Sequence, residues 1–249
     1  MELDEYRKMH ALEENFWWYR GMLRITKQIL GRHFPPGADI RILDAGCGTG
    51  KMLLELEHYA TRAPVGFDSS SEAMRFLKVR GSVNVLQAST TEIPFGSEIF
   101  DLVTSFEVLC QLPGDGDAEA LREFHRVLKP AGKIYLRLPA YQWMYASHDR
   151  HQLTFRRYRR HDLVARVERA GFSVLKASYA NFFLFPMLVF KRLVLERVGI
   201  LSESSDLRPV PASLNALLEI PLHIESRLLR HQSFRFPCGL SLICLAEKK

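Results

Sequence analysis

Short apolar runs and amphipathic stretches alternate along most of the chain. The apolar runs are bounded by glycine, proline or charged residues, which is typical of buried strands. We expect strands at 42–44, 64–68, 82–87, 99–106, 133–139, 172–179 and 238–246. Apolar positions at helical spacing predict helices between them, at 51–59, 69–80, 118–128 and 162–171. This alternation predicts a parallel, doubly wound sheet with its ligand site at the carboxyl ends of the strands.

Helical segments are expected on both sides of this core. Residues 1–35 carry apolar positions at roughly helical spacing and end at a Pro-Pro pair. Near the other end, an apolar run, a polar linker at 202–211 and an amphipathic helix at 212–230 precede the last strand. We therefore divide the chain into an N-terminal helical lid (1–36), a core (37–181), a helical cap insertion (182–236) and a final strand of the core sheet (237–249).

The first strand runs into a turn with glycine at alternate positions, Asp44-Ala-Gly-Cys-Gly-Thr-Gly50. Glycine permits the unusual backbone conformations of a tight turn, and the helix that follows presents free amides, as in nucleotide sites. A phosphate-binding P-loop is excluded because Gly50-Lys51 is followed by Met52. The dinucleotide pattern requires glycine at position 51, so a nicotinamide oxidoreductase remains as the weaker alternative.

The remaining pattern, Asp-x-Gly-x-Gly-x-Gly, resembles motif I of the class I S-adenosylmethionine-dependent methyltransferases. The stretch from Phe100 to Pro139 is similar to the strand, helix and Leu-Lys-Pro-Gly-Gly run of the bacterial type 11 group, and the loop after it resembles one branch of that group. The resemblance implies a Rossmann-like α/β fold with a seven-stranded, mostly parallel sheet, S-adenosylmethionine as cofactor and methyl transfer as the reaction. A noncatalytic protein that binds S-adenosylmethionine is a further alternative.

The expected cofactor site follows the ends of successive strands. Asp68 ends the second strand about 20 residues after the glycines, where an acid accepts hydrogen bonds from ribose hydroxyls; it is also placed to cap the next helix. By resemblance, the glycine turn holds the methionine end of the cofactor, and Ser89 replaces an acid that meets adenine in the family. The expected cofactor-binding residues are Asp44, Gly46, Cys47, Gly48, Asp68, Ser69, Ser89, Thr90 and Phe106.

Three adjacent aromatic residues, Phe16, Trp17 and Trp18, lie in the predicted lid. Consecutive side chains cannot all share one face of a helix, so at least one is expected to protrude from the face that packs on the sheet. A second interpretation is a lid over the cofactor, with a ring against the sulfonium and Arg20 or Arg24 paired with the methionine carboxylate.

An irregular segment at 140–161 is rich in aromatic, histidine and arginine residues. A loop of this length within a compact domain is usually functional, so we expect it to border the methyl acceptor. Tyr141, His148 and Asp149 are the candidate bases. His148 and His151 have no third ligand at metal spacing, and no metal site is expected.

The charge balance favours anionic partners. Lys and Arg exceed Asp and Glu to give a net charge of +6, with a pI of about 9.2. In the arginine-rich run 156–160 we expect at least two arginines to belong to a solvated charge run, and no DNA or RNA partner, because no nucleic-acid module accompanies the run. The four cysteines show neither disulfide nor metal spacing, and the N-terminus lacks a signal-like apolar core, so a cytoplasmic location is expected.

An apolar run at 182–190 is followed by Lys191, Arg192 and Arg197. It is too short to span a bilayer. Two interpretations stay open: the run packs under the cap as core, or residues 182–197 make a peripheral membrane contact, at the inner face of the membrane. In the second case the acceptor is a lipid or lipid-linked molecule, and in the first a soluble small molecule. The sequence leaves the oligomeric state open.

Overall fold

The computed structural model describes residues 3–81, 84–191 and 209–249. Within these ranges the strands are β1 (Ile42–Ala45), β2 (Val65–Asp68), β3 (Val85–Gln87), β4 (Phe100–Phe106), β5 (Leu128–Pro139), β6 (Phe172–Ala180) and β7 (Ser241–Lys248). The α-helices are α1 (Leu3–Leu12), α2 (Trp17–Leu30), α3 (Lys51–Leu56), α4 (Ser71–Val79), α5 (Gly116–Val127), α6 (Ser147–His151), α7 (Arg160–Arg169), α8 (Phe185–Phe190) and α9 (Ala212–Leu229). Short 3-10 turns occupy Glu57–Tyr59, Leu109–Gln111 and Gln142–Met144.

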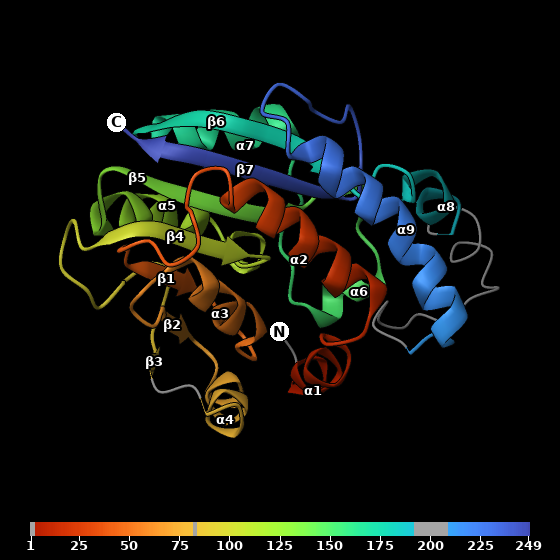
Figure 1. The fold of residues 1–249 in the computed structure, drawn as a ribbon, viewed down its shortest axis with the longest axis horizontal. Coiled ribbons are helices and arrows are strands. Elements are labelled where there is room, and N and C mark those ends of the chain that lie inside the picture. The colour runs from red at the N-terminus through yellow and green to blue at the C-terminus, as the bar shows by residue number, and fades with distance from the viewer. Residues whose placement is uncertain (1–2, 82–83, 192–208) are drawn as a thin grey trace.

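The strands form one seven-stranded sheet with the order β3-β2-β1-β4-β5-β7-β6. Strands β1 to β5 pair in parallel, whereas β7 runs antiparallel to both β5 and β6. Helices α2 and α3 lie in front of the sheet in Figure 1, and α5 and α7 lie behind it. The predicted Rossmann-like, mostly parallel sheet is therefore confirmed.

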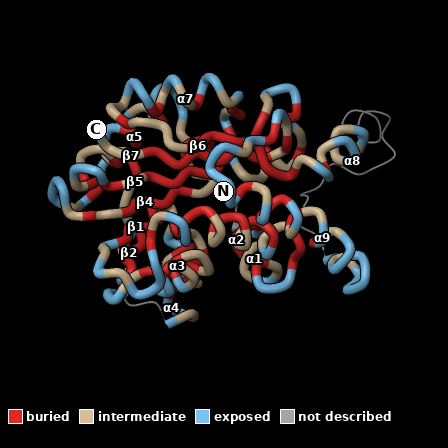
Figure 2. Tube along the Cα trace, turned by 45° about the horizontal axis from the view of Figure 1, so that its top comes forward, coloured by how far each residue is buried: buried red, intermediate tan, exposed pale blue. Residues whose placement is uncertain are grey.

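The core lies between the sheet and its two helical layers. All four residues of β1 are buried, and the largest fully buried side chains include Tyr135 on β5, Phe67 on β2 and Phe124 on α5. Figure 2 shows the central strands buried along most of their length. The short apolar runs of the sequence become strands because a parallel strand covered on both faces buries consecutive side chains.

The predicted N-terminal helix is wrong as a single element, because it breaks into α1 and α2. The backbone at Phe16 is extended, with φ −73° and ψ 130°. Asn215 of α9 stabilises the break: its Oδ1 accepts the Trp17 N–H at 2.8 Å, and its Nδ2 donates to the Asn15 carbonyl at 2.7 Å. Phe16 thereby enters the core together with Trp17.

Helix α7 also begins earlier than predicted. Its N-cap is Arg159, so Asp162 lies inside the first turn and is not the cap. An acid in the first turn still interacts favourably with the positive end of the helix dipole. The Arg160 N–H at the start of the helix instead donates to the Tyr179 hydroxyl of β6 at 3.0 Å.

Helices α8 and α9 project beyond one end of the sheet (Figure 1). Helix α9 packs closely along α2 at Gly21, where an added Cβ would lie 2.2 Å from the Leu222 side chain. Buried Glu225 of α9 accepts the backbone N–H groups of Asn181 at 2.7 Å and Phe183 at 3.1 Å, which fixes the start of the α8 segment. The basic stretch after Lys191 and most of the predicted linker lie outside the described residues. No helix within the described ranges is long and apolar enough to cross a membrane.

Candidate functional site

The glycine turn is held against the end of β2. The N–H groups of Gly46 and Cys47 both donate to the Phe67 carbonyl, at 2.8 and 2.9 Å. All three turn glycines have positive φ, between 55° and 87°. A Cβ at Gly46 would lie 2.3 Å from a Val108 methyl carbon. The turn therefore requires glycine for both its conformation and its close packing.

Asp44 at the end of β1 is buried beneath this turn. Its Oδ1 accepts the Thr104 hydroxyl at 2.6 Å, whereas its Oδ2 has no hydrogen-bond partner. Burial raises the pKa of the Asp44 carboxyl to about 7, against opposing effects of the Thr104 hydrogen bond and the charge of Arg137. A buried carboxylate oxygen without a partner is costly, so it favours a ligand that brings a cation or a donor to this point.

Asp68 at the end of β2 connects three elements. Its Oδ2 accepts the Gly48 N–H at 2.9 Å, and its Oδ1 accepts the Ser70 N–H at 2.9 Å and the Tyr6 hydroxyl at 3.2 Å. The N-cap of α4 is Ser70, whose Oγ accepts the Glu72 N–H. The capping role considered for Asp68 thus belongs to Ser70, and Asp68 joins the glycine turn to helix α1.

Helix α1 and the residues after it cover the glycine turn. The Met9 Cε lies 3.0 Å from the point where a Cβ of Gly48 would be. Glu13 accepts the Thr49 hydroxyl at 2.6 Å and pairs with Arg80 of the α4 C-cap. Polar contacts as well as packing therefore hold this N-terminal segment against the glycine turn.

A cavity of about 500 Å³ opens at the carboxyl ends of β1, β2 and β4, within the ~300–1,000 Å³ typical of small-molecule sites. Helices α1 and α2 with the loop between them form one wall, α6 and the loop after it form another, and α8 and α9 contribute apolar side chains. Of the predicted site residues, it is lined by Asp44, Gly46, Cys47, Gly48, Asp68, Phe106, His148 and Asp149.

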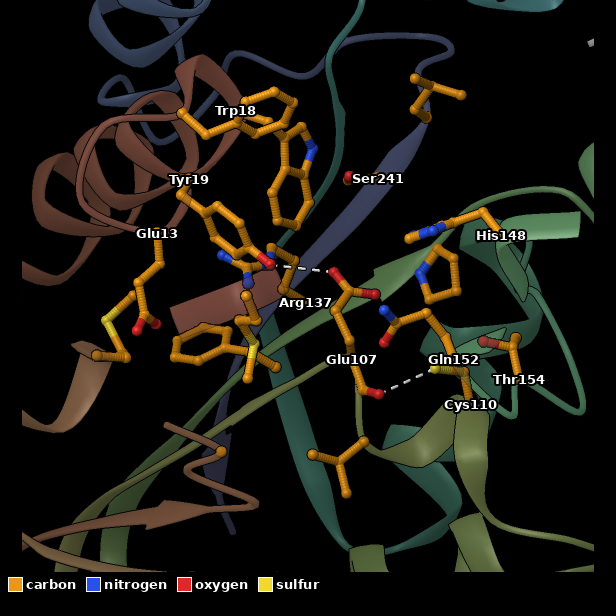
Figure 3. Close-up of a pocket in the computed structure, with 18 of the residues that line it drawn as sticks. Glu13, Trp18, Tyr19, Glu107, Cys110, Arg137, His148, Gln152, Thr154 and Ser241 are labelled. Atoms are coloured by element: carbon orange, nitrogen blue, oxygen red, sulfur yellow. Dashed lines mark hydrogen bonds and ion pairs between the residues drawn. The ribbon is translucent and has the colours of Figure 1, made fainter. Parts of the chain in front are cut away.

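Glu107 and Arg137 form an ion pair inside the cavity, with 3.1 Å between Oε1 and Nε. The Arg137 guanidinium lies between the rings of Trp18 and Phe106, 4.9 and 4.7 Å from their centroids. Burial raises the pKa of Glu107, and the charge of Arg137 opposes the shift. Figure 3 shows Glu107 in the middle of the cavity, between Arg137 on one side and His148 on the other.

Helix α6 presents His148 to the cavity and is fastened by Asp149. The Asp149 carboxylate accepts two hydrogen bonds from the Arg157 guanidinium, at 2.8 and 3.0 Å, and one from the Ala146 N–H at 2.8 Å. Both members of this ion pair are buried. The geometry gives Asp149 a positioning role, since its oxygens are held by Arg157 and the backbone, while His148 on the same turn faces the cavity.

The structure does not bring the other predicted residues to the cavity lining. Ser69 uses its carbonyl to accept a hydrogen bond from the Gln87 side chain. The Ser89 hydroxyl bonds to Thr91 at 2.8 Å within a local turn that also contains Thr90. Tyr141 stacks on Tyr179, with 5.0 Å between ring centroids, and burial raises its pKa above the usual range. Their predicted roles stay predictions.

The arginines of α2 and of the basic run after α6 form ion pairs with different acids. Arg20 and Arg24 approach Glu219 of α9, at 3.3 and 3.1 Å, and do not line the cavity. Residues four apart share one helix face, and this face of α2 is turned to α9. In the run after α6, Arg156 pairs with buried Asp117 at 3.2 Å and Arg157 with Asp149, so these two arginines are held in intramolecular ion pairs and are not part of a solvated charge run.

Residues 43–136 match the family model of the methyltransferase domain. They contain the glycine turn, Asp68 and the strand that ends at the Glu107 ion pair. Residues 43–136 therefore contain a methyltransferase domain, and the chain has the fold of class I S-adenosylmethionine-dependent methyltransferases. Its family and fold imply S-adenosylmethionine as the cofactor and favour this interpretation over a nicotinamide oxidoreductase.

Relatives and solved structures agree with this methyltransferase domain. The chain is 32% identical over 138 residues to the uncharacterized methyltransferase YodH of Bacillus subtilis, covering 53% of this chain and 57% of YodH. It is 27% identical over 130 residues to a demethylmenaquinone methyltransferase of Chlorobaculum tepidum, covering 49% and 48%. A methyltransferase solved in complex with the Haloferax volcanii Trm112 activator superposes with a TM-score of 0.62 at 19% identity, covering 98% of this chain and 94% of that chain. The chain spans about half the length of these two curated relatives.

The site of the methyltransferase domain fits its implied cofactor. The partnerless Asp44 oxygen offers an acceptor for an ammonium group, and the positive-φ glycines leave backbone exposed where a ligand must approach closely. Asp68 offers a carboxylate for hydroxyl groups, at present shared with Tyr6. Among the described residues no cluster of His, Cys, Asp or Glu is arranged to hold a metal ion.

The sequence analysis missed two groups of cavity residues. Arg137 and Glu107 had a weak signal, because Arg137 lies near the carboxyl end of β5 and Glu107 directly follows β4. Tyr6 had none, since its contact with Asp68 spans 62 positions of the chain.

Proposed function

We propose that this protein transfers the methyl group of S-adenosylmethionine to an amphipathic acceptor with a polar reacting end and an apolar body. The observation that carries the proposal is the continuity of the cavity. It joins the glycine turn and Asp68 to the Glu107–Arg137 pair and then to the apolar side chains of α8 and α9.

The two ends of the acceptor half differ in chemistry. Glu107, Arg137 and His148 supply charge and hydrogen bonds next to the cofactor side. Leu188 of α8 and Leu218 of α9 line the other end and offer apolar contact, next to Lys191 at the C-cap of α8. A ring with an ionisable hydroxyl and an attached hydrocarbon matches both ends, and the demethylmenaquinone methyltransferase relative is named for a quinone-type acceptor.

Bound S-adenosylmethionine supplies a methyl group already activated by the sulfonium charge. The protein residues therefore have to align the acceptor and exclude water, and a base is needed only when the attacking atom carries a proton. Glu107 is suited to accept such a proton because burial raises its pKa. His148 is placed to hold the reacting end from the α6 side, Asp149 positions that helix through Arg157, and Arg137 stabilises the ionised acceptor.

The test uses S-adenosylmethionine labelled in its methyl group and a total lipid extract from cells that lack the protein. We expect label to move into the organic phase with the wild-type protein. Glu107→Gln and His148→Ala should reduce transfer by about 100-fold or more, the usual contribution of a positioned acid or base, and leave S-adenosylhomocysteine affinity nearly unchanged. Glu57→Gln, an exposed carboxylate on a surface turn, is the matched control. Label that stays in water-soluble products refutes the amphipathic acceptor.

A further inference from the structure

Helices α8 and α9 present large apolar side chains to solvent. On α9 the exposed residues recur every three or four positions and therefore lie on one helix face. The α8 segment adds a second group at similar spacing. Each of these side chains is between 41% and 61% exposed, and together they define the cap face: Phe183, Met187, Phe190, Leu214, Leu217, Ile220 and Ile224.

The α9 part of the cap face is separate from the face of α9 that packs on the rest of the protein. Leu222 and Leu229 of α9 are fully buried, and the first of these packs on Gly21 of α2. Helix α9 is thus apolar on two sides, whereas a surface helix ordinarily has one apolar stripe and one polar face. Helix α8 has no buried residue. Figure 2 shows both helices at the edge of the molecule, away from the buried sheet.

The charges around the cap face are positive. The two acids of α9, Glu219 and Glu225, are buried. Glu219 is already approached by two cations, Arg20 and Arg24, and Arg227 is exposed on α9 itself. Within the described part of α8 and α9, therefore, cations are exposed and acids are not. This arrangement complements an anionic surface.

Two exposed aromatic residues extend the cap face toward α6. Trp143 packs edge-to-face on Phe185 of α8, with 6.1 Å between ring centroids, and Tyr145 follows it in the chain. Both are more than one-third exposed. Tryptophan and tyrosine are enriched at membrane–water boundaries because an apolar ring there keeps its polar atom hydrated.

We propose that the cap face docks on the surface of a bilayer that contains anionic phospholipid. Apolar residues enter the headgroup region while the exposed Arg227 meets the lipid phosphates. Met187 belongs both to the cap face and to the cavity lining, and the cavity also contains Leu218 of α9. Docking would therefore place the apolar end of the cavity next to the bilayer. The docking itself is independent of the proposed function, but entry of the acceptor from the bilayer rests on the proposed amphipathic acceptor.

The test is co-sedimentation of the full chain with phosphatidylcholine vesicles, with and without phosphatidylglycerol. We expect binding to the anionic vesicles at low salt and weaker binding at high salt. The triple variant Phe190→Ser, Leu217→Ser and Ile220→Ser removes exposed side chains that do not line the cavity, and should lower the bound fraction at least about ten-fold. The control is Val79→Ser on α4, whose residue is even more exposed but lies outside the cap face.

Thermal unfolding and S-adenosylhomocysteine binding should be the same in the triple variant and in wild type. A lower thermal stability of the triple variant would show that the cap-face side chains pack as part of the core, and it would overturn the proposal. Equal sedimentation of the variant and wild type would also overturn it. So would light scattering that finds a dimer of the wild-type protein and a monomer of the triple variant, because the cap face would then be a dimer interface. If the protein does not bind vesicles but still methylates lipid in detergent solution, docking is rejected and the amphipathic acceptor stands. If the protein binds vesicles but labels no lipid, the amphipathic acceptor is rejected and docking stands.

Discussion

Asp44 should make cofactor binding depend on pH near neutrality. Its carboxyl has a pKa of about 7 because it is buried, and an incoming ammonium group pairs with the ionised form. With this pKa, about 9% of the group is ionised at pH 6 and about 91% at pH 8, so affinity should rise about ten-fold over this interval. The sign follows from the raised pKa: the free protein holds a proton that the bound state must release.

Calorimetry with S-adenosylhomocysteine at pH 6, 7 and 8 measures this effect. Repeating the titration at pH 7 in two buffers of different ionisation enthalpy should show release of about half a proton per ligand. The matched variant Asp44→Asn keeps the shape and removes the titration, so its affinity should be weak at pH 8 and almost independent of pH. A wild-type affinity that is flat between pH 6 and 8, or a slope that Asp44→Asn retains, would refute the reasoning.

Three further changes test other contacts. Gly46→Ala should lower the free energy of unfolding by about 1–3 kcal/mol more than Gly37→Ala in urea titrations, because both glycines have positive φ but only an added Cβ at Gly46 meets another side chain; equal losses would contradict the packing argument. Asp149→Ala should cost about 3–5 kcal/mol in the same assay, since it leaves buried Arg157 unpaired; a loss near zero would remove its positioning role. Burial raises the pKa of Glu225 to about 7, so the native protein holds a proton that the unfolded chain loses, and stability falls as pH rises from 5 to 8. Asp44 adds to the same slope, so Glu225→Gln should reduce the slope in thermal scans without abolishing it; an unchanged slope would exclude a contribution from Glu225.

The sheet could be predicted because its information is local. Each strand is a short apolar run with a breaker beside it, and Asp44 and Asp68 mark the ends of two neighbouring strands. The glycine turn was equally predictable, since three glycines at alternate positions mark a turn whose positive φ values other residues rarely adopt. Both acids line the cavity because they lie at the carboxyl ends of neighbouring parallel strands.

The N-terminal segment and the α6 side of the cavity depend on contacts between distant segments. The break at Phe16 needs Asn215, which lies 198 positions beyond the Trp17 N–H that it accepts. The role of Asp149 needs Arg157, which the sequence shows only as one member of a basic run. Periodicity cannot reveal such pairings, because they arise when the sheet has already placed the segments side by side.

The place of β7 has a consequence for synthesis of the chain. It separates β5 from β6 in the sheet, yet it follows them in sequence by the whole stretch from 181 to 240. At ~5–20 residues per second, a ribosome needs roughly 3–12 s to cross that stretch. During this interval the facing edges of β5 and β6 have no partner strand, and unpaired edges are prone to pair with other chains. The nascent protein should therefore depend on chaperones most strongly just before β7 emerges.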